Sequence, residues 1–272
     1  MSLLIEPAAS WFMALLGLVL GSFLNVCIHR LPLGKSVVWP GSECPACGAR
    51  ILWFQNIPVV SWLALRGRCA SCASRIPFRY PLVEALGGGI LLALWNAYGA
   101  SAEFAIAGLF ALALVVLFFT DWDHQLLPDA VTLPGLLVGM GVAPLNPFLG
   151  EGIWPRLFAA GTGAVLGAGL LWSIGAVYSR IRGVEAMGLG DVKMMGMVGS
   201  FSGALGVLFT LFSASLVGAV VGLALIPLRG KSMKDALPFG CFLAPAALAA
   251  LLVGRQAVQG YLHLVGIAGG GP

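Results

Sequence analysis

Long apolar runs constrain this chain more strongly than any other feature of its sequence. Residues 8–27 are mostly apolar, and about 20 such residues form a helix that crosses the hydrocarbon core of a bilayer. Of the 272 residues, 59% are hydrophobic and only 10% are charged, whereas soluble domains carry about 25% charged residues. We therefore predict a polytopic membrane protein. Because residues 8–27 lack the cleavage site of a signal peptide, we interpret them as the first spanning helix.

Further apolar segments follow the first one along the chain. They lie at residues 82–98, 104–120, 130–146, 155–178, 192–204, 205–228 and 237–254. The stretch 192–228 has two interpretations, one long broken helix or two short helices that meet near residues 200–203, and the second keeps the basic residues on one side. Apolar runs of this length exclude the alternating pattern of a membrane barrel. The predicted fold class is all-α, a transmembrane bundle of about eight spans with a small cytoplasmic zinc-knuckle loop.

The one long polar segment, residues 29–81, sets the predicted topology. It carries seven of the fifteen Lys and Arg residues against a single acid, Glu43, and loops rich in Lys and Arg stay in the cytoplasm. Counting spans from this loop places both chain termini outside. The same count places three further segments on the cytoplasmic side, at residues 121–129, 180–193 and 229–235. The predicted domains are a first helix at 1–28, the loop at 29–81 and a transmembrane core at 82–272.

Four cysteines of the polar loop have the spacing of a metal site. Cys44 and Cys47 form one C-x-x-C pair and Cys69 and Cys72 form another, with 21 residues between the pairs. Two such knuckles present four thiolates to a metal at about 2.3 Å, and zinc is its usual occupant. Two disulfides are the competing interpretation, which a reducing cytosol disfavours. We expect a structural zinc that supplies much of the folding free energy of the loop.

Two other features of the sequence have ordinary structural interpretations. Aromatic residues lie among the basic residues of the loop, as they do in some nucleic-acid-binding proteins. The net charge is only +4 and the topology explains the basic residues, so we expect these aromatics to pack at the bilayer interface and predict no nucleic-acid partner. Cys27 and Cys241 lie in apolar segments, where we expect ordinary buried thiols.

Three aspartates follow the apolar run at 104–120, in the stretch LFFTDWDHQLLPD. A carboxylate inside a bilayer costs roughly 2.5–3.5 kcal/mol at mid-depth and is a functional candidate by default. Asp121 and Asp123 point about 200° apart on a helix, so they cannot both face one site. Asp129 follows Pro128 and fits the start of the next helix. Asp121 ends the apolar run directly, and we expect it to be the most desolvated of the three.

Asp191 is the predicted partner of one of these aspartates; the spacing does not decide which one, and Asp121 leads narrowly. Asp191 opens another apolar segment after Gly188 and Gly190, whose missing Cβ atoms allow backbone and substrate to come close. The predicted topology puts Asp121 and Asp191 on the same side of the membrane. Of two facing carboxyl groups, one is charged and activates a water, while the other keeps a proton, hydrogen-bonds a scissile carbonyl and helps to protonate the leaving amine. The pair therefore predicts aspartic peptidase chemistry.

Several separate motifs resemble those of one bacterial family. They are GSFLNVCIHRLP (21–32), the two C-x-x-C pairs, RYPLVEALGG (79–88), TDWDHQLLPD (120–129), GLGDVKMMGMVGSF (188–201) and PFG (238–240). Together they cover nearly the whole chain and are similar to the bacterial prepilin peptidases, also called type IV leader peptidases. In that family the catalytic aspartates are the first of the D-x-D-H-Q-L-L-P-D pattern and the one in G-x-G-D. The resemblance therefore implies Asp121 and Asp191 as the catalytic residues.

The resemblance implies a bifunctional enzyme of the inner membrane. Such enzymes cut the leader from type IV prepilins and type II secretion pseudopilins on the cytoplasmic side, then methylate the new amino group with S-adenosylmethionine. The sequence contains no glycine-rich nucleotide motif, so the residues that bind the methyl donor are unknown. Glu84, Glu185 and Lys193 lie at the same predicted level and either read the charges of a substrate or anchor helix ends.

Two other functions compete with this one. The first is a peptidase of the G-x-G-D type without methyl transfer, as in archaeal relatives, and the four-cysteine loop argues against it because those relatives look to lack that loop. The second is a proton-coupled transporter, in which intramembrane aspartates relay protons. A transporter predicts internal repeats and helices broken at mid-membrane. The sequence has no convincing repeat, and its acids cluster at one face of the membrane.

Overall fold

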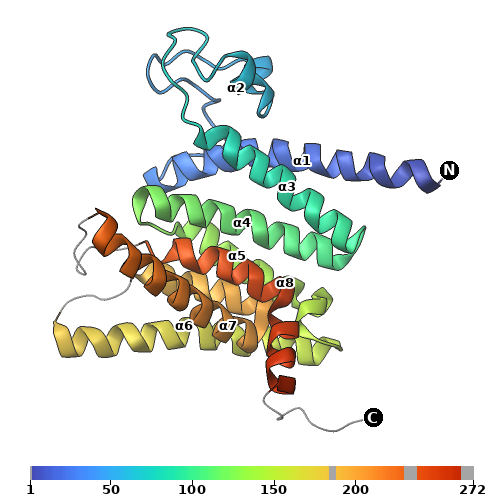
Figure 1. Cartoon of the computed structure of the whole chain (residues 1–272), viewed down its shortest axis with the longest axis vertical. Helices are drawn as coiled ribbons and strands as arrows, with labels where there is room; N and C mark the ends of the chain where they lie inside the picture. The colour runs from blue at the N-terminus through green and yellow to red at the C-terminus, as the bar shows by residue number, and fades with distance from the viewer. Residues whose placement is uncertain (1, 184–187, 230–237, 265–272) are drawn as a thin grey trace. The chain divides into compact units, whose positions relative to one another are not determined.

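The computed structural model describes residues 2–183, 188–229 and 238–264, and its regular elements in these ranges are all helical (Figure 1). The all-α fold class is thereby confirmed. The long helices are α1 (Ser2–Arg30), α3 (Arg79–Tyr98), α4 (Ala102–His124), α5 (Asp129–Val142), α6 (Ile153–Arg182), α7 (Leu189–Arg229) and α8 (Gly240–Leu264). A short helix, α2 (Val60–Ala64), lies within the polar loop.

The described residues include helices that are long and apolar enough to cross a membrane. By length and hydropathy these are Ala8–Leu33, Ala102–His124, Ile153–Arg182 and Leu189–Ala224, with Asp129–Leu145 and Gly240–Gly254 as shorter apolar helices. Large apolar side chains on them face outward, among them Trp11, Val165 and Phe212, each at least 70% exposed. Such surfaces are covered by lipid in a membrane protein. The prediction of a helical membrane protein is confirmed. The predicted number of about eight spans is approximate, because several of the helices are short.

The stretch 192–228 is a helical hairpin rather than one straight helix. α7 breaks at Gly203, whose φ of 69° and ψ of −176° are not helical. A Cβ added to Gly167 of α6 would meet both Met195 and Val207, which lie on either side of the break. In a straight helix those two residues would lie about 18 Å apart. The chain therefore reverses direction at Gly203, as the two-helix interpretation expects.

A buried asparagine stabilises this reversal. In an unbroken helix the carbonyl of Phe201 would accept from an amide four residues later, but here the Nδ2 of Asn146 donates to it at 2.9 Å. The Oδ1 of Asn146 accepts from the amide of Phe148 at 3.0 Å. Close packing of the hairpin on α6 depends on Gly163 and Gly199, because a Cβ on either residue would overlap the backbone of the other.

The chain forms two compact units, residues 1–116 and 117–272. In the first unit α1 packs along α3. A Cβ on Gly17 or Gly21 of α1 would overlap the backbone of α3, which is the close approach that small residues allow between membrane helices. In the second unit the α7 hairpin packs against α5, α6 and α8, and its buried side chains include Met194 and Phe201. The hairpin is the core of the second unit.

Candidate active site and metal centre

Asp121 lies in the last turn of α4, which continues four residues beyond the predicted apolar segment to His124. The Asp121 side chain is only 5% exposed, whereas Asp123 and His124 are exposed. Its Oδ2 accepts a hydrogen bond from the backbone amide of Cys241 at 3.0 Å. The prediction that Asp121 and Asp123 face different surroundings, with Asp121 the more desolvated, is confirmed.

Asp191 lies in the first turn of α7 and is partly buried. Its carboxyl lies near enough to that of Asp121, at the end of α4, for the two charges to interact. A Cβ on Gly190 would lie 3.0 Å from the Cβ of Leu127, in the connection between α4 and α5. Gly190 therefore lets α7 begin close to this connection. Gly188 is less restricted, because the nearest atom to its added Cβ is the Asp191 Oδ2 at 3.8 Å.

The beginning of α8 completes the surroundings of Asp121. A Cβ on Gly240 would lie 2.9 Å from the Asp121 Oδ2 and 3.1 Å from Leu127, so this position has no room for a side chain. The thiol of Cys241 donates to the carbonyl of Phe118 on α4 at 3.4 Å. Cys241 is a buried thiol, as the sequence predicts, but the contact of its backbone amide with Asp121 was not predicted. The neighbouring PFG motif was the available signal.

An ion pair joins α5 to α7 in the same unit. The Nζ of Lys193 lies 2.8 Å and 2.7 Å from the two carboxylate oxygens of Asp129. Asp129 is the first residue of α5, as the sequence predicts, but its side chain makes this ion pair and does not cap the helix. Lys193 is engaged by Asp129, which supports the anchoring interpretation of Lys193 over substrate reading.

Glu84 also has a structural partner. It is buried in the first unit, and its Oε2 accepts the backbone amide of Val59 at 2.7 Å. Val59 has a φ of 62°, which is costly for a β-branched residue, so Glu84 stabilises a strained turn of the polar loop. Its role is to anchor the loop to α3. Glu185, and residues 230–235 of the last predicted cytoplasmic segment, lie outside the described residues.

The four cysteines of the loop converge as the spacing predicts. Their Sγ atoms all lie within 4.8 Å of one another, and those of Cys44 and Cys72 are 3.9 Å apart. A tetrahedral zinc with bonds of about 2.3 Å needs sulfur atoms about 3.8 Å apart. The two knuckles repeat one hydrogen bond, from the Gly48 amide to the Cys44 carbonyl at 2.8 Å and from the Ala73 amide to the Cys69 carbonyl at 2.9 Å.

Donors around the cluster favour the thiolate form of two of its cysteines, Cys44 and Cys72, whereas the neighbouring thiols help to raise the pKa of Cys47 to about 11. The amide of Ala46, then that of Cys47 and the hydroxyl of Ser74, lower the pKa of Cys44 to about 6. The Ser74 hydroxyl also lowers the pKa of Cys72, whose Sγ lies 3.1 Å from the Ser74 Oγ. Since the thiolate is the form that binds metal, these residues fit a closed four-sulfur site for a metal such as zinc.

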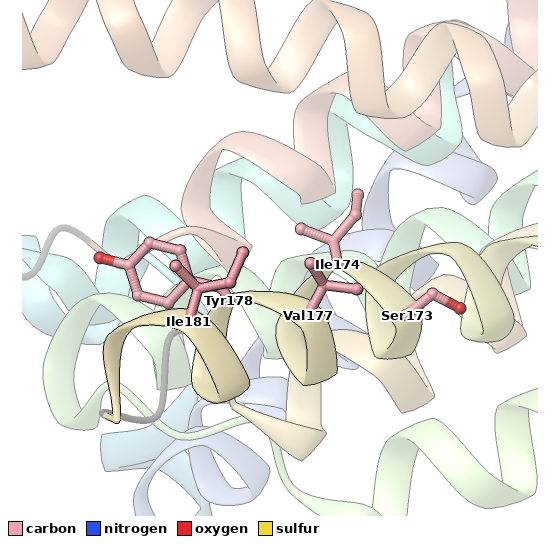
Figure 2. Close-up of a pocket in the computed structure, with 5 residues that line it drawn as sticks. All are labelled: Ser173, Ile174, Val177, Tyr178 and Ile181. Carbon is pink, nitrogen blue, oxygen red and sulfur yellow. The ribbon is translucent and has the colours of Figure 1, made fainter.

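A cavity of about 400 Å³ opens along α6 and contains none of these groups. Figure 2 shows that its lining side chains come from successive turns of this one helix. They are Ser173, Ile174, Val177, Tyr178 and Ile181. None of these lining residues carries a carboxyl group, a basic group or a thiol. The cavity is therefore an apolar groove on the surface of α6, and it is not the candidate active site.

Comparisons with known proteins agree with the resemblance seen in the sequence. A model of the bacterial peptidase A24 N-terminal domain matches residues 15–98, and a model of the type IV leader peptidase family matches residues 108–223, which include Asp121 and Asp191. Relatives named prepilin leader peptidase/N-methyltransferase match nearly the whole chain. The relative from Pseudomonas putida is 39% identical over 97% of this chain and 98% of its own length. No solved structure matches the chain significantly.

Two more relatives with the same name extend this agreement. The protein from Pseudomonas aeruginosa is 39% identical over 93% of this chain and 93% of its own length. The protein from Stutzerimonas stutzeri is 37% identical over 91% of this chain and 92% of its own length. The similarity therefore includes the cysteine loop as well as the helices that carry the aspartates.

Proposed function

Because this chain belongs to the type IV leader peptidase family, we propose that it cleaves the leaders of type IV prepilins and type II secretion pseudopilins and methylates the new amino terminus. It is a bifunctional enzyme, an aspartic endopeptidase and an N-methyltransferase. The observation that carries the peptidase activity is the meeting of Asp121 and Asp191 at the ends of α4 and α7. The methyltransferase activity follows from the relatives, whose shared name includes it.

Peptide hydrolysis needs a base and an acid on either side of the scissile bond. One carboxylate of the pair takes a proton from water, whose oxygen bonds to the carbonyl carbon, while the protonated carboxyl group gives its proton to the carbonyl oxygen. The resulting gem-diol collapses when the first group returns its proton to the nitrogen and the second recovers one from a hydroxyl. The C–N bond then breaks, and both carboxyl groups are back in their starting states.

The two aspartates are placed at the cytoplasmic face of the inner membrane in this proposal, with both chain termini on the periplasmic side. Residues 29–81 hold seven of the fifteen Lys and Arg residues, and a loop this basic stays in the cytoplasm. A prepilin has a basic leader followed by an apolar helix. Its apolar helix lies in the bilayer, so its scissile bond reaches the pair at the interface.

Zinc and S-adenosylmethionine are the implied cofactor and co-substrate. Cys44, Cys47, Cys69 and Cys72 would hold the zinc, whose role would be structural, because it would link the two knuckles. S-adenosylmethionine supplies the methyl group, and its binding residues are not assigned. Mass spectrometry of the amino terminus of a processed client reports both the cut position and the added methyl group, so an unmethylated cut product would restrict the enzyme to the peptidase activity.

The transporter alternative predicts a broken helix that carries the acids. α7 does break, but at Gly203, and Asp191 lies about 18 Å before the break along the helix. Asp121 lies in the unbroken α4. The break and the carboxyl pair are therefore separate features, which supports peptidase chemistry over proton relay.

Asparagine substitutions test the carboxyl pair directly. We expect Asp121→Asn and Asp191→Asn each to lower prepilin cleavage in membranes by about 10²–10⁴-fold, because each removes one proton-transfer group. Asp123→Asn is the matched control, since its side chain is exposed two residues away, and we expect it to retain most of the activity. Full cleavage by the Asp121 or the Asp191 variant, at normal protein levels, would rule out the pair.

A further inference from the structure

The first turn of α8 donates a hydrogen bond to Asp121, and the geometry points to separate roles for the two carboxyl groups. We propose that the backbone amide of Cys241, held in place by Gly240, keeps Asp121 ionised, so that Asp121 is the general base and Asp191 is the group that carries the proton. Cys241 and Gly240 are then positioning residues for the reaction. This inference rests on the proposed peptidase function.

The amide of Cys241 is available to Asp121 because of its place in the helix. The first four amides of a helix have no acceptor within it, and that of Cys241 in the first turn of α8 donates to the Asp121 Oδ2 at 3.0 Å. The beginning of a helix also carries partial positive charge, which favours a carboxylate over a neutral acid. In a side chain that is 5% exposed, such a charge-assisted hydrogen bond is strong.

Asp121 receives more donors than Asp191 does. The amide of Gly240 adds to the Cys241 amide at Asp121, whereas Asp191 has the amide of Gly188, on its own exposed turn. The pair has one negative charge to place, because two facing carboxylates repel each other. The charge is more stable on the residue with more donors, which is Asp121.

Other ionisable groups near Asp121 do not reverse this preference. From α7 it faces Asp191, and from α8 it faces the thiol of Cys241. Asp129 and Lys193, which join α5 to α7, neutralise each other in a bidentate ion pair. Asp191 also lies at a helix beginning, that of α7, so the feature that distinguishes Asp121 is the amide donor that the first turn of α8 adds from a second helix.

Gly240 fixes the distance between this turn and the carboxylate. Its added Cβ would lie 2.9 Å from the Asp121 Oδ2, 3.0 Å from the Asp121 Cγ and 3.1 Å from Leu127. Contacts this short force either the carboxylate or the turn to move. Any side chain at position 240 would therefore push the Cys241 amide and the Asp121 carboxylate apart.

The inference fixes the direction of proton flow. Water gives its proton to Asp121 while its oxygen bonds to the scissile carbon, and Asp191 gives its proton to the carbonyl oxygen. When the C–N bond breaks, Asp121 passes its proton to the leaving amine and Asp191 takes one from the gem-diol. The acidic limb of the activity profile then reports the pH at which Asp121 becomes ionised.

The test is the pH profile of kcat/KM for cleavage of one prepilin substrate by the full-length protein in lipid nanodiscs. Cys241→Pro removes the amide hydrogen, and proline is tolerated in the first turn of a helix. We expect the acidic limb to move to higher pH by about one unit or more, because the carboxylate loses a donor and ionises less readily. Gly240→Ala is expected to move the limb in the same direction, and it decides the test if the proline variant does not accumulate.

Two variants separate this effect from a general disturbance. Cys241→Ala keeps the amide and loses only the thiol, so we expect its acidic limb to stay closer to the wild-type position than that of Cys241→Pro. Gly141→Ala on α5 adds a Cβ that meets no atom within 4 Å, and we expect it to keep both the wild-type rate and the wild-type profile.

The outcomes distinguish this inference from the proposed function. If the limb keeps its wild-type position in Cys241→Pro and Gly240→Ala while Asp121→Asn is inactive, the role assignment is overturned and the peptidase remains. If Asp121→Asn cleaves normally, the proposed function itself fails. A limb that moves to lower pH in Cys241→Pro would also overturn the assignment, because it would mean that the amide favours the protonated form.

Discussion

At the scale of single residues, acids that are neighbours in the sequence lie in different surroundings, and the proposed chemistry depends on that difference. Asp121 and Asp123 are two positions apart on one helix, yet the first is buried against α8 and the second is exposed. Asp129, six residues further on, is neutralised by Lys193. Of the three acids in this stretch, only Asp121 combines burial with a neighbouring carboxyl group. Burial and a neighbouring carboxyl group therefore distinguish Asp121 from the other two acids, which supports its proposed catalytic role.

The cysteine cluster allows a prediction at the same scale. We expect purified protein to contain about one zinc ion and Cys44→Ser to lose it, because the Cys44 Sγ belongs to the group of four sulfur atoms within 4.8 Å of one another. Elemental analysis of the purified protein by mass spectrometry measures the metal directly. Cys27→Ser is the matched control, since Cys27 is a buried thiol of α1 outside the cluster. An unchanged zinc content in Cys44→Ser would contradict the site.

Sequence patterns anticipate side chains better than they anticipate backbone groups. The C-x-x-C spacing predicts the sulfur cluster. The helical angle between Asp121 and Asp123 predicts that they face different surroundings, and the end of the apolar run predicts that Asp121 is the buried one. Cys241 escaped prediction because its contribution is a backbone amide, which every residue except proline carries. Its partner lies 120 residues earlier in the chain, and no local spacing marks a contact of that kind.

At the scale of helices, glycine sets how closely the elements pack. Gly163 and Gly199 bring α6 and the α7 hairpin into backbone contact, and Gly17 and Gly87 do the same for α1 and α3. Within a bilayer, apolar surface gives no preference for another helix over lipid, so association depends on close packing and on interhelical hydrogen bonds. Asn146 supplies such a bond to the hairpin.

The α6 helix offers a matched pair of glycine substitutions. We expect Gly163→Ala to destabilise the protein by about 1–3 kcal/mol, because the new Cβ overlaps the backbone of Gly199 and Gly203 and overpacking carries a cost of that size. Gly169→Ala lies on the same helix and meets no atom within 4 Å, so we expect no loss of stability. Thermal unfolding in detergent measures both. Equal destabilisation by the two variants would contradict the close contact.

The hairpin could be predicted only in part. The need to keep basic residues on one side of the membrane predicts a reversal near residues 200–203, and the structure has it at Gly203. The sequence does not single out that glycine, because the chain contains 38 glycines and many of them lie within helices. The conformation at Gly203 depends on contacts with α6 and on Asn146, which are distant in the sequence.

At the scale of the whole molecule, the two chemical centres belong to different compact units. All four sulfur ligands lie in the unit formed by residues 1–116, and the carboxyl pair with its contacts from α7 and α8 lies in residues 117–272. α4 runs through the boundary between the units. The metal centre and the carboxyl pair therefore have separate sets of stabilising contacts.

This separation predicts that the centres respond differently to metal removal. We expect a chelator to increase the protease sensitivity of residues 29–81, because a small metal loop loses much of its folding free energy with its metal. We expect leader cleavage to persist, because none of the described contacts of Asp121 involves a cysteine of the cluster. Limited proteolysis and a cleavage assay on the same sample measure the two effects. Loss of cleavage in parallel with loss of zinc would contradict this independence.

The repeated turn of the metal loop has one more consequence. Gly48 in the first knuckle and Ala73 in the second both have positive φ, 68° and 57°, a conformation that is easy for glycine and costs other residues roughly 1 kcal/mol. The two halves of the loop are therefore unequal in strain although they donate the same ligands. Without a bound ion, relief of this strain would favour opening of the half that contains Ala73 over the half that contains Gly48.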